Sequence, residues 1–430
     1  MNVRFLAFSA LALLAPTAFC QTQAAQAKSP PKAAPHSAKD AAAVHASAIV
    51  IDTHADTPQR FVDDGYDLDQ PGAQVNLPDA KKGNLGAEFF SIWVEPTLYK
   101  DHYAKRTLEL IDSVYQQAAR HPTEMRMAFS PADIEAAHRE HKLAALMGIE
   151  GGHSIENSLA LLRDYYRLGV RYMTLTWSNS NDWADSSGDA DDAKVPHTKE
   201  GLTEFGKDVV YEMNRLGMMV DVSHVSDKTF IRTLIITRAP VIASHSGSRA
   251  LCSAKRNMTD DMLRQVAING GVVQVNFFSA FVSQQYYDAY IKLQPEIAKA
   301  QAELDAKYKA QGKPTPYSEY DKLQREWAAK IPRPPFSALI DQIDHIAKVA
   351  GVDHVGIGSD FDGIPTSPEG IDTVADLPKI SAALLQRGYS PEDVHKIMGG
   401  NLLRVFRQVE QVSRDLKSVE QRPRISQKQP

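Results

Sequence analysis

The chain contains little cysteine: its 430 residues include only Cys20 and Cys252. Two thiols exclude a disulfide framework and any zinc site built on thiolates, so a metal would have to bind to histidines and carboxylates. The chain also lacks an excess of positive charge, since it has 48 Lys and Arg and 53 Asp and Glu, which gives a formal net charge of −5. This balance excludes the basic domain typical of nucleic-acid binding, so nucleic acid is not an expected partner.

Long apolar runs are also absent. The N-terminal run, residues 5–15, is too short to span a bilayer permanently, and no later segment offers the ~18 consecutive apolar residues of a membrane helix. Residues 1–20 have the charged, apolar and small-residue layout of a signal peptide, with cleavage after Cys20 or Ala27. The protein is therefore expected to be exported, to the periplasm or outside the cell. Phe19 is bulkier than the residue that usually precedes a lipid-modified cysteine, which argues against an anchor on Cys20.

Composition divides the rest of the chain into three parts. Residues 21–44 are rich in Ala, Gln, Lys and Pro and predict a flexible leader, and residues 414–430 predict a polar tail. Residues 45–413 form the predicted folded domain, in which short β-branched apolar runs alternate with segments of helical period. The expected strands are Ala48–Asp52, Ala87–Val94, Leu143–Ile149, Tyr172–Thr176, Met218–Val222, Val241–Ser244, Gly271–Asn276 and His354–Gly358.

Eight such strands alternating with amphipathic helices predict a closed (β/α)₈ TIM-type barrel. The alternative is a doubly wound open sheet, which usually carries a glycine-rich turn after the first strand, whereas this chain has DTHADTP there. Residues 279–335 combine aromatic and charged residues at helical spacing and are too long for a bare loop. They predict a helical insertion between the seventh and eighth strands, serving as a packing cap, a lid or an oligomer contact.

Ionisable side chains follow five of the expected strands. Because the carboxyl ends of barrel strands meet on one face, these side chains are expected to converge. Three imidazoles and three carboxylates exceed the needs of one tetrahedral zinc, and ligation by nitrogen and oxygen without sulfur suits zinc in a hydrolytic site. Two ions sharing one carboxylate would use the set fully, activate a bridging water and leave one carboxylate to move a proton. The strand-end segments that supply these side chains are residues 52–56, 150–153, 221–224, 244–246 and 358–363.

A series of motifs then resembles one known family. In chain order they are DTHADTP, IEGGHSIEN, LTWSNSNDWADS, DVSHVS, ASHSGSRALCSAKRNMTDD, GIGSDFDG and MGGNLLRVF. They run from Ile49 to Phe406 and resemble the membrane (renal) dipeptidase family, the zinc dipeptidases of the amidohydrolase superfamily. The resemblance implies a metallodipeptidase with two Zn²⁺ ions per subunit. Family members are often dimers, so it is also compatible with a homodimer.

The resemblance assigns a part to each site residue. It implies that His54 and Asp56 hold one zinc, that His224 and His245 hold the second, and that Glu150 bridges them. Asp360 matches the residue that takes a proton from the bridging water and passes it to the leaving amine. Arg256 matches the arginine that binds the terminal carboxylate of the substrate, a pairing for which a guanidinium is well suited.

One position departs from the family pattern. Animal members have a histidine 27 residues after the bridging glutamate, where it stabilises the oxyanion, and this chain has Trp177 there. An indole N–H donates one hydrogen bond but cannot become cationic. Stabilisation of the oxyanion would then rest more on zinc, on Asn179 or Asn181, or on His153. Trp177 is accordingly predicted to affect the substrate range more than the type of reaction.

The expected function is hydrolysis of dipeptides by a hydroxide that bridges two zinc ions. The family precedent adds acceptance of a D-residue at the C-terminal position. One alternative is a hydrolase of another amide, such as an N-acyl amino acid or a lactam, which would use the same metals. Another is a metal-containing binding protein without turnover.

Overall fold

The computed structural model describes residues 38–198, 200–313 and 315–420 of the chain. The predicted signal peptide, its cleavage sites, Cys20 and most of the predicted leader lie outside the described residues. Within the described part, no helix is both long enough and apolar enough to cross a membrane.

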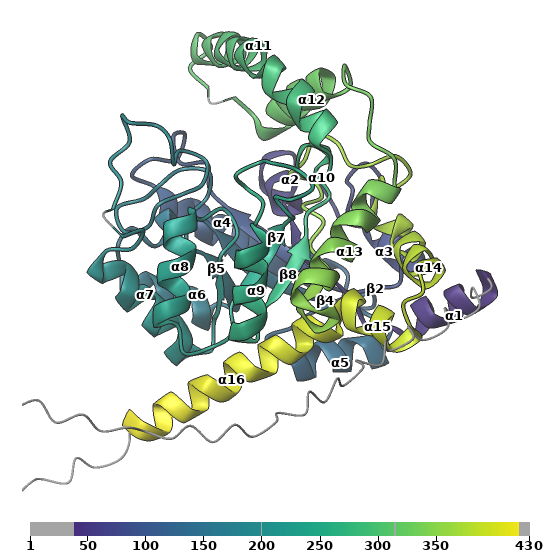
Figure 1. Cartoon of the computed structure of the whole chain (residues 1–430). Coiled ribbons are helices and arrows are strands. Elements are labelled where there is room, and N and C mark those ends of the chain that lie inside the picture. The colour runs from purple at the N-terminus through teal and green to yellow at the C-terminus, as the bar shows by residue number, and fades with distance from the viewer. Residues whose placement is uncertain (1–37, 199, 314, 421–430) are drawn as a thin grey trace, which may run out of the picture. The chain divides into compact units, whose positions relative to one another are not determined.

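Eight parallel strands form a barrel in the order β1, β2, β4, β5, β6, β7, β8 and β9 (Figure 1). Between β9 and β1, the Asp360 amide donates to the His54 carbonyl at 2.9 Å and the Asp56 amide donates to the Phe361 carbonyl at 2.8 Å, so the barrel is nearly closed. The predicted (β/α)₈ fold is confirmed. The strands are Val50–Ala55 (β1), Leu85–Trp93 (β2), Leu143–Glu150 (β4), Val170–Thr174 (β5), Met219–Asp221 (β6), Ile242–Ser246 (β7), Val272–Val275 (β8) and Val355–Ile357 (β9).

Helices on the outside of the barrel connect these strands. Several begin where a side chain caps the first turn: Thr203 Oγ1 accepts from the Gly206 amide and Thr259 Oγ1 from the Met262 amide, both at 3.2 Å. The main covering helices are Tyr103–Arg120 (α4), Pro131–Arg139 (α5), Leu159–Arg167 (α6), Glu204–Leu216 (α7), Asp227–Ile236 (α8), Asp260–Asn269 (α9), Ser337–Ala350 (α13) and Pro378–Gln386 (α14).

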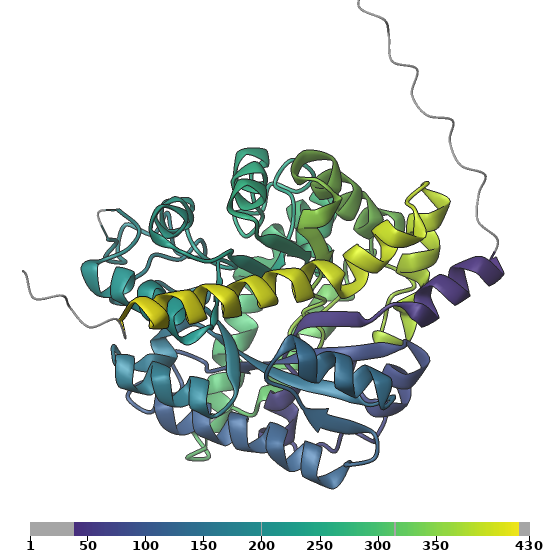
Figure 2. The same cartoon turned by 90° about the horizontal axis from the view of Figure 1, so that it is seen from below.

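The folded region extends beyond the predicted domain at both ends. Helix α1 (Ala38–Ser47) begins inside the range predicted as leader, because Ala41 is buried and His45 bonds to Ser381 Oγ at 2.8 Å and to the Gly83 carbonyl at 2.9 Å. Helix α16 (Asn401–Glu420) continues through residues 414–420, which were predicted as tail, and runs across the underside of the barrel (Figure 2). Its apolar face packs against the strands, so the helix persists beyond the motif that ends at Phe406.

Among the described residues between β8 and α13 there are three helices: α10 (Ser279–Val282), α11 (Gln284–Lys309) and α12 (Tyr317–Ala328). Helix α12 lies against α2 (Thr57–Asp63), the helix that follows β1 (Figure 1). Arg60 of α2 forms an ion pair with Asp321 of α12 at 2.9 Å, and the Tyr317 hydroxyl donates to the Asp362 carbonyl at 2.7 Å. These contacts place α12 at the rim where the strands end.

A glycine makes room for an aromatic ring inside the barrel. A Cβ atom on Gly148 of β4 would lie only 1.9 Å from the Tyr172 ring of β5, so any other residue there would displace the ring. The Tyr172 side chain is fully buried and its hydroxyl reaches Thr53 and His54 on β1. Gly148 therefore helps to position the Tyr172 hydroxyl beside His54.

A buried carboxyl on β2 is a source of instability. Glu88 is fully buried, and neither carboxyl oxygen has a hydrogen-bond partner among the described residues. Burial, together with the charge of Asp52, raises the pKa of Glu88 well above its usual value of 4.5. The unfolded chain releases this proton at a lower pH than the folded protein does. Stability is therefore lost as the pH rises from 4.5 toward the folded-state pKa.

Replacing Glu88 with glutamine is expected to remove this loss. At pH 8 the Glu88→Gln variant should be more stable than the parent by about 1–3 kcal/mol, because folding of the parent at this pH must take up a proton or bury an unpaired charge, and glutamine requires neither. The difference should shrink toward pH 4.5, where both states of the parent become protonated. Denaturant unfolding at the two pH values measures it, with the exposed Glu369→Gln as control. An equal difference at both pH values would contradict the explanation.

Candidate metal centre

Two ligand-type side chains lie at the end of β1: His54 within the strand and Asp56 directly after it. Side chains alternate along an extended strand, so His54 and Asp56 point to the same side. His54 Nε2 lies 3.7 Å from Asp56 Oδ2 and 3.4 Å from Glu150 Oε2, at the end of β4. All three side chains are buried, and their ligand atoms lie within 4.8 Å of one another. They make up the first candidate cluster.

The second cluster comes from the other side of the barrel. His224 follows β6 and His245 lies on β7, and their Nε2 atoms are 3.0 Å apart. Glu150 Oε1 lies 2.9 Å from His224 Nε2 and 3.3 Å from His245 Nε2. The two oxygens of Glu150 thus face different clusters, which is the arrangement that a bridging carboxylate requires.

The rings of His54 and His245 are oriented by hydrogen bonds on their outer nitrogens. The Tyr172 hydroxyl donates to the Thr53 carbonyl at 3.0 Å and so accepts from His54 Nδ1 at 2.8 Å. His245 Nδ1 lies 2.8 Å from Ser244 Oγ, which donates to Asp221 Oδ2 at 2.6 Å. Both rings therefore keep Nε2 directed at Glu150, as in metal sites whose outer hydrogen bonds set the histidine tautomer.

The protonation states favour binding of a cation. Burial and the charge of Arg256 lower the pKa of His224 to about 4, and burial and His54 lower that of His245 well below its usual value, so both imidazoles are neutral at pH 7. Burial opposes protonation of His54, but Tyr172 and Glu150 outweigh it and raise the pKa of His54. Ligation requires neutral imidazole, so a metal ion would take the place of that proton.

Unpartnered polar atoms provide a test of whether a metal fits here. His54 Nε2 and Asp56 Oδ1 are buried and have no hydrogen-bond partner in the described part of the chain. Such atoms are costly to bury unless an ion or a solvent molecule satisfies them. The donors are nitrogen and oxygen without sulfur, a set that suits zinc in a hydrolytic site. The residues present therefore fit a metal at both clusters.

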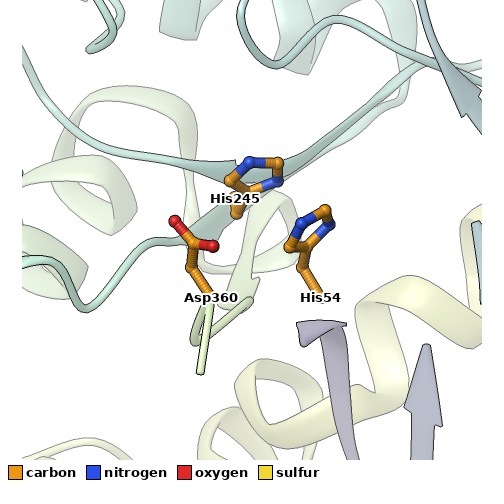
Figure 3. Close-up of side chains that lie close together, drawn as sticks. All are labelled: His54, His245 and Asp360. Atoms are coloured by element: carbon orange, nitrogen blue, oxygen red, sulfur yellow. The ribbon is translucent and has the colours of Figure 1, made fainter. Parts of the chain in front are cut away.

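Asp360 follows β9 and joins the two clusters. Its carboxylate lies near the rings of His54 and His245, with ligand atoms within 4.8 Å of one another (Figure 3). Its backbone has a φ of 63°, and Asn276 Nδ2 donates to Oδ2 at 2.8 Å. Burial raises the pKa of Asp360 to about 8; His54 opposes this shift, and the charges of Asp56 and Glu150 add to it. A carboxyl with such a pKa can hold and release a proton near neutral pH.

Arg256 lies beside the second cluster and is half-buried, unlike a solvated surface arginine. Its guanidinium donates to Ser246 Oγ at 2.9 Å and to the His245 carbonyl at 2.8 Å, while its buried Nε has no partner among the residues described. Burial lowers the pKa of Arg256 to about 10, so the group remains cationic at pH 7. A fixed guanidinium at this place can bind a carboxylate.

Trp177 also borders the site. Its ring centroid lies 6.4 Å from that of His224 and 4.9 Å from that of Trp93. Of the other groups considered for the oxyanion, Asn181 is engaged in its own loop, since its Oδ1 accepts from the backbone and its Nδ2 donates to it. Burial lowers the pKa of His153, and the neutral ring donates from Nε2 to the Val94 carbonyl at 2.8 Å. That leaves His153 without a second N–H.

The structure brings together all of the predicted site residues, with Trp177 and Arg256 at the edge of the two clusters. Sequence reasoning missed Tyr172, Ser244 and Asp221, the residues behind the ligands. Ser244 and Asp221 could have been found from the sequence. Ser244 directly precedes His245, and Asp221 lies three positions before His224, in both cases near a strand end. Tyr172 had none, because it was indistinguishable from an ordinary core aromatic.

Comparison with known proteins gives the same family. The family described as membrane dipeptidase (peptidase family M19) matches residues 38–420. Dipeptidase 3 of Mus musculus is 36% identical over 344 residues, 79% of this chain, and the match spans 58% of that relative's length. A probable dipeptidase from Pseudomonas aeruginosa has 26% identity and a TM-score of 0.73, covering 87% of this chain and 98% of that one.

A metallo peptidase from Rhodobacter sphaeroides shares the fold, with a TM-score of 0.67 at 23% identity over 84% of this chain and 100% of its own. Together with the family match over nearly all of the described residues, the geometry at the strand ends agrees with the motifs. The chain belongs to the membrane dipeptidase family.

Proposed function

We propose that this protein is a binuclear zinc hydrolase that cleaves dipeptides. The observation that supports this most strongly is the placement of Glu150, whose two oxygens face two separate clusters of ligand-type side chains. The first cluster would hold one ion through His54 and Asp56, and the second would hold the other through His224 and His245. The family match supports the same assignment.

Two bound zinc ions would supply a Lewis acid for the scissile carbonyl and an activated bridging water at neutral pH. The chain's own residues would do the rest. Asp360, held by Asn276, would take the proton of the attacking water and deliver it to the leaving amine. Arg256 would bind the C-terminal carboxylate of the substrate and so fix the distance from that end to the reacting bond. The indole N–H of Trp177, whose ring lies beside His224, remains as a candidate donor to the carbonyl oxygen.

The test is metal analysis of the purified protein together with a substrate panel. The proposal expects two zinc ions per chain and hydrolysis of L,L-dipeptides and of dipeptides with a C-terminal D-residue. Acceptance of the D-residue is proposed from the family resemblance. Activity on N-acyl amino acids or lactams but not on dipeptides would favour the rival amide hydrolase, for which Trp177 is the argument. Bound metal without any hydrolysis would favour a binding protein.

Arg256 offers a specific prediction. The Arg256→Met variant is expected to raise KM for dipeptides by about 10- to 100-fold, the value of a charge-assisted pairing, with a smaller effect on kcat. Dipeptide amides, which lack the carboxylate, should be affected much less. Steady-state kinetics on both substrates measure this, with the exposed neighbour Lys255→Met as control. Equal losses on the acid and the amide would contradict carboxylate binding.

Export and assembly are also part of the proposal. The N-terminal pattern of residues 1–20 supports secretion, which fractionation of the native source would test. A homodimer is proposed from the family resemblance, and light scattering of the purified protein would measure it.

A further inference from the structure

A cavity opens at the rim beside the end of β2. Its volume is about 300 Å³, and much of its wall is aromatic or aliphatic. Its lining includes Val62 from α2, Trp93, Leu98 and Tyr99 from the end of β2 and the loop after it, and Tyr317 and Tyr320 from α12.

The cavity adjoins the candidate metal centre. Trp93 is the register partner of Glu150 on the neighbouring strand, and its ring centroid lies 4.9 Å from that of Trp177. Trp177 in turn lies against His224. On the other wall, the Tyr317 hydroxyl donates to the Asp362 carbonyl, two residues beyond Asp360. A ligand that extends from the cavity past Trp93 and Trp177 would therefore reach the metal centre.

The cavity also lies across the barrel from Arg256. In the strand order, β2 and β7 are four steps apart in either direction around the eight strands, and Arg256 bonds to residues of β7. A dipeptide whose C-terminal carboxylate is bound by Arg256 would pass its peptide bond over the clusters. Its N-terminal residue would then reach the β2 side.

The inserted helix α12 forms one wall of this cavity. It is held to the barrel by the Arg60–Asp321 ion pair, whose side chains are only 17% and 14% exposed, and by Arg325, which donates to Gln74 Oε1 at 3.2 Å. Tyr317 and Tyr320 both come from α12. Without the insertion this wall would be missing.

We propose that the cavity is the subsite for the side chain of the substrate's N-terminal residue, and that the wall supplied by α12 makes it select aromatic side chains. The inference rests on the proposed dipeptidase function and names its substrate class. An apolar cavity of ~150 Å³ can bind benzene, so the volume here accommodates an aromatic side chain. Aromatic rings around it favour tilted or edge contacts with such a group.

The charged groups of the lining already have partners. Asp63 accepts from Arg106 at 2.9 Å, and the Glu95 carboxylate accepts from the Leu98 amide. These contacts reduce the attraction for a cationic side chain relative to an aromatic one. A preference for lysine or arginine at the N-terminal position would therefore contradict the proposed selectivity.

The experiment compares kcat/KM for Phe-Gly and Ala-Gly in zinc-loaded protein. The parent is expected to prefer Phe-Gly by about tenfold or more, as apolar pockets discriminate. Val62→Trp, which fills the cavity from α2, and Tyr320→Ala, which removes part of the α12 wall, should each lower the Phe-Gly to Ala-Gly ratio by about tenfold. Tyr308→Ala, a tyrosine of the same insertion outside the cavity lining, should leave the ratio unchanged.

The outcomes separate two failures. If the parent hydrolyses no dipeptide, the proposed function is wrong, and the subsite assignment, which rests on it, is wrong as well. If dipeptides are cleaved but both variants keep the parent's ratio, the subsite assignment alone is overturned. Zinc content measured on each variant shows whether a change in rate comes from the cavity or from lost metal. A variant that fails to fold leaves the other to decide.

Discussion

Replacing Asp360 with asparagine is expected to lower kcat for dipeptides by about 10²- to 10⁴-fold, the range for losing a general acid or base. Asparagine has the same shape and can still accept the hydrogen bond from Asn276 through its amide oxygen. It also tolerates the left-handed backbone at this position better than most residues. An amide cannot take up a proton at neutral pH, so only the proton transfer should be lost.

The control for this variant is Asp362→Asn. Asp362 is buried and has the same φ of 63°, but its carboxylate accepts from Gln74 and Thr57 and does not belong to either cluster. Its substitution should affect stability more than kcat. Zinc analysis of both variants should find the parent's metal content. Full turnover in Asp360→Asn, or loss of zinc together with activity, would contradict the assigned part of Asp360.

The candidate ligands were predictable because barrel topology converts strand order into spatial proximity. His54 and Glu150 are 96 positions apart in the sequence, yet each lies at the carboxyl end of a parallel strand, and these ends meet at one rim. What could not be read from the chain is which oxygen of Glu150 faces which cluster. That depends on side-chain torsions set by neighbouring strands.

The residues behind the ligands were harder to foresee. Tyr172 reaches His54 only because Gly148 on the adjacent strand has no side chain, and this relation depends on the register of β4 against β5. The register of two strands is set by many packing contacts together, so the sequence of either strand alone does not predict it. The pairing of Ser244 with Asp221 is of the same kind, since the two residues belong to neighbouring strands.

Elements at the edges of the fold were missed for a different reason. Strand β3 (Met125–Met127) is three residues long and pairs only with β4, too short for a periodic pattern. Helix α1 is rich in alanine, and its few buried positions resemble a low-complexity leader. In both cases tertiary contacts supply what local composition lacks.

The other large effect is expected at Glu150. Although burial opposes its ionisation, the charge of His54 holds the pKa of Glu150 well below the usual value. It is therefore anionic at any pH used for assay. In Glu150→Gln the charge is lost, and the amide can present its oxygen to one cluster only, with its NH₂ group facing the other. One of the two ion sites should then fail.

We expect Glu150→Gln to bind at most one zinc per chain after dialysis and to lose activity by about 10³-fold or more, equivalent to about 4 kcal/mol of transition-state stabilisation. Glu88→Gln is the matched control, a buried glutamate of the adjacent strand outside both clusters, and should keep both ions. Metal analysis and steady-state kinetics on the two variants test whether Glu150 is needed for both ion sites. Two ions retained in Glu150→Gln would show that this carboxylate does not bridge, because an amide nitrogen facing a cluster offers a cation no lone pair and no charge.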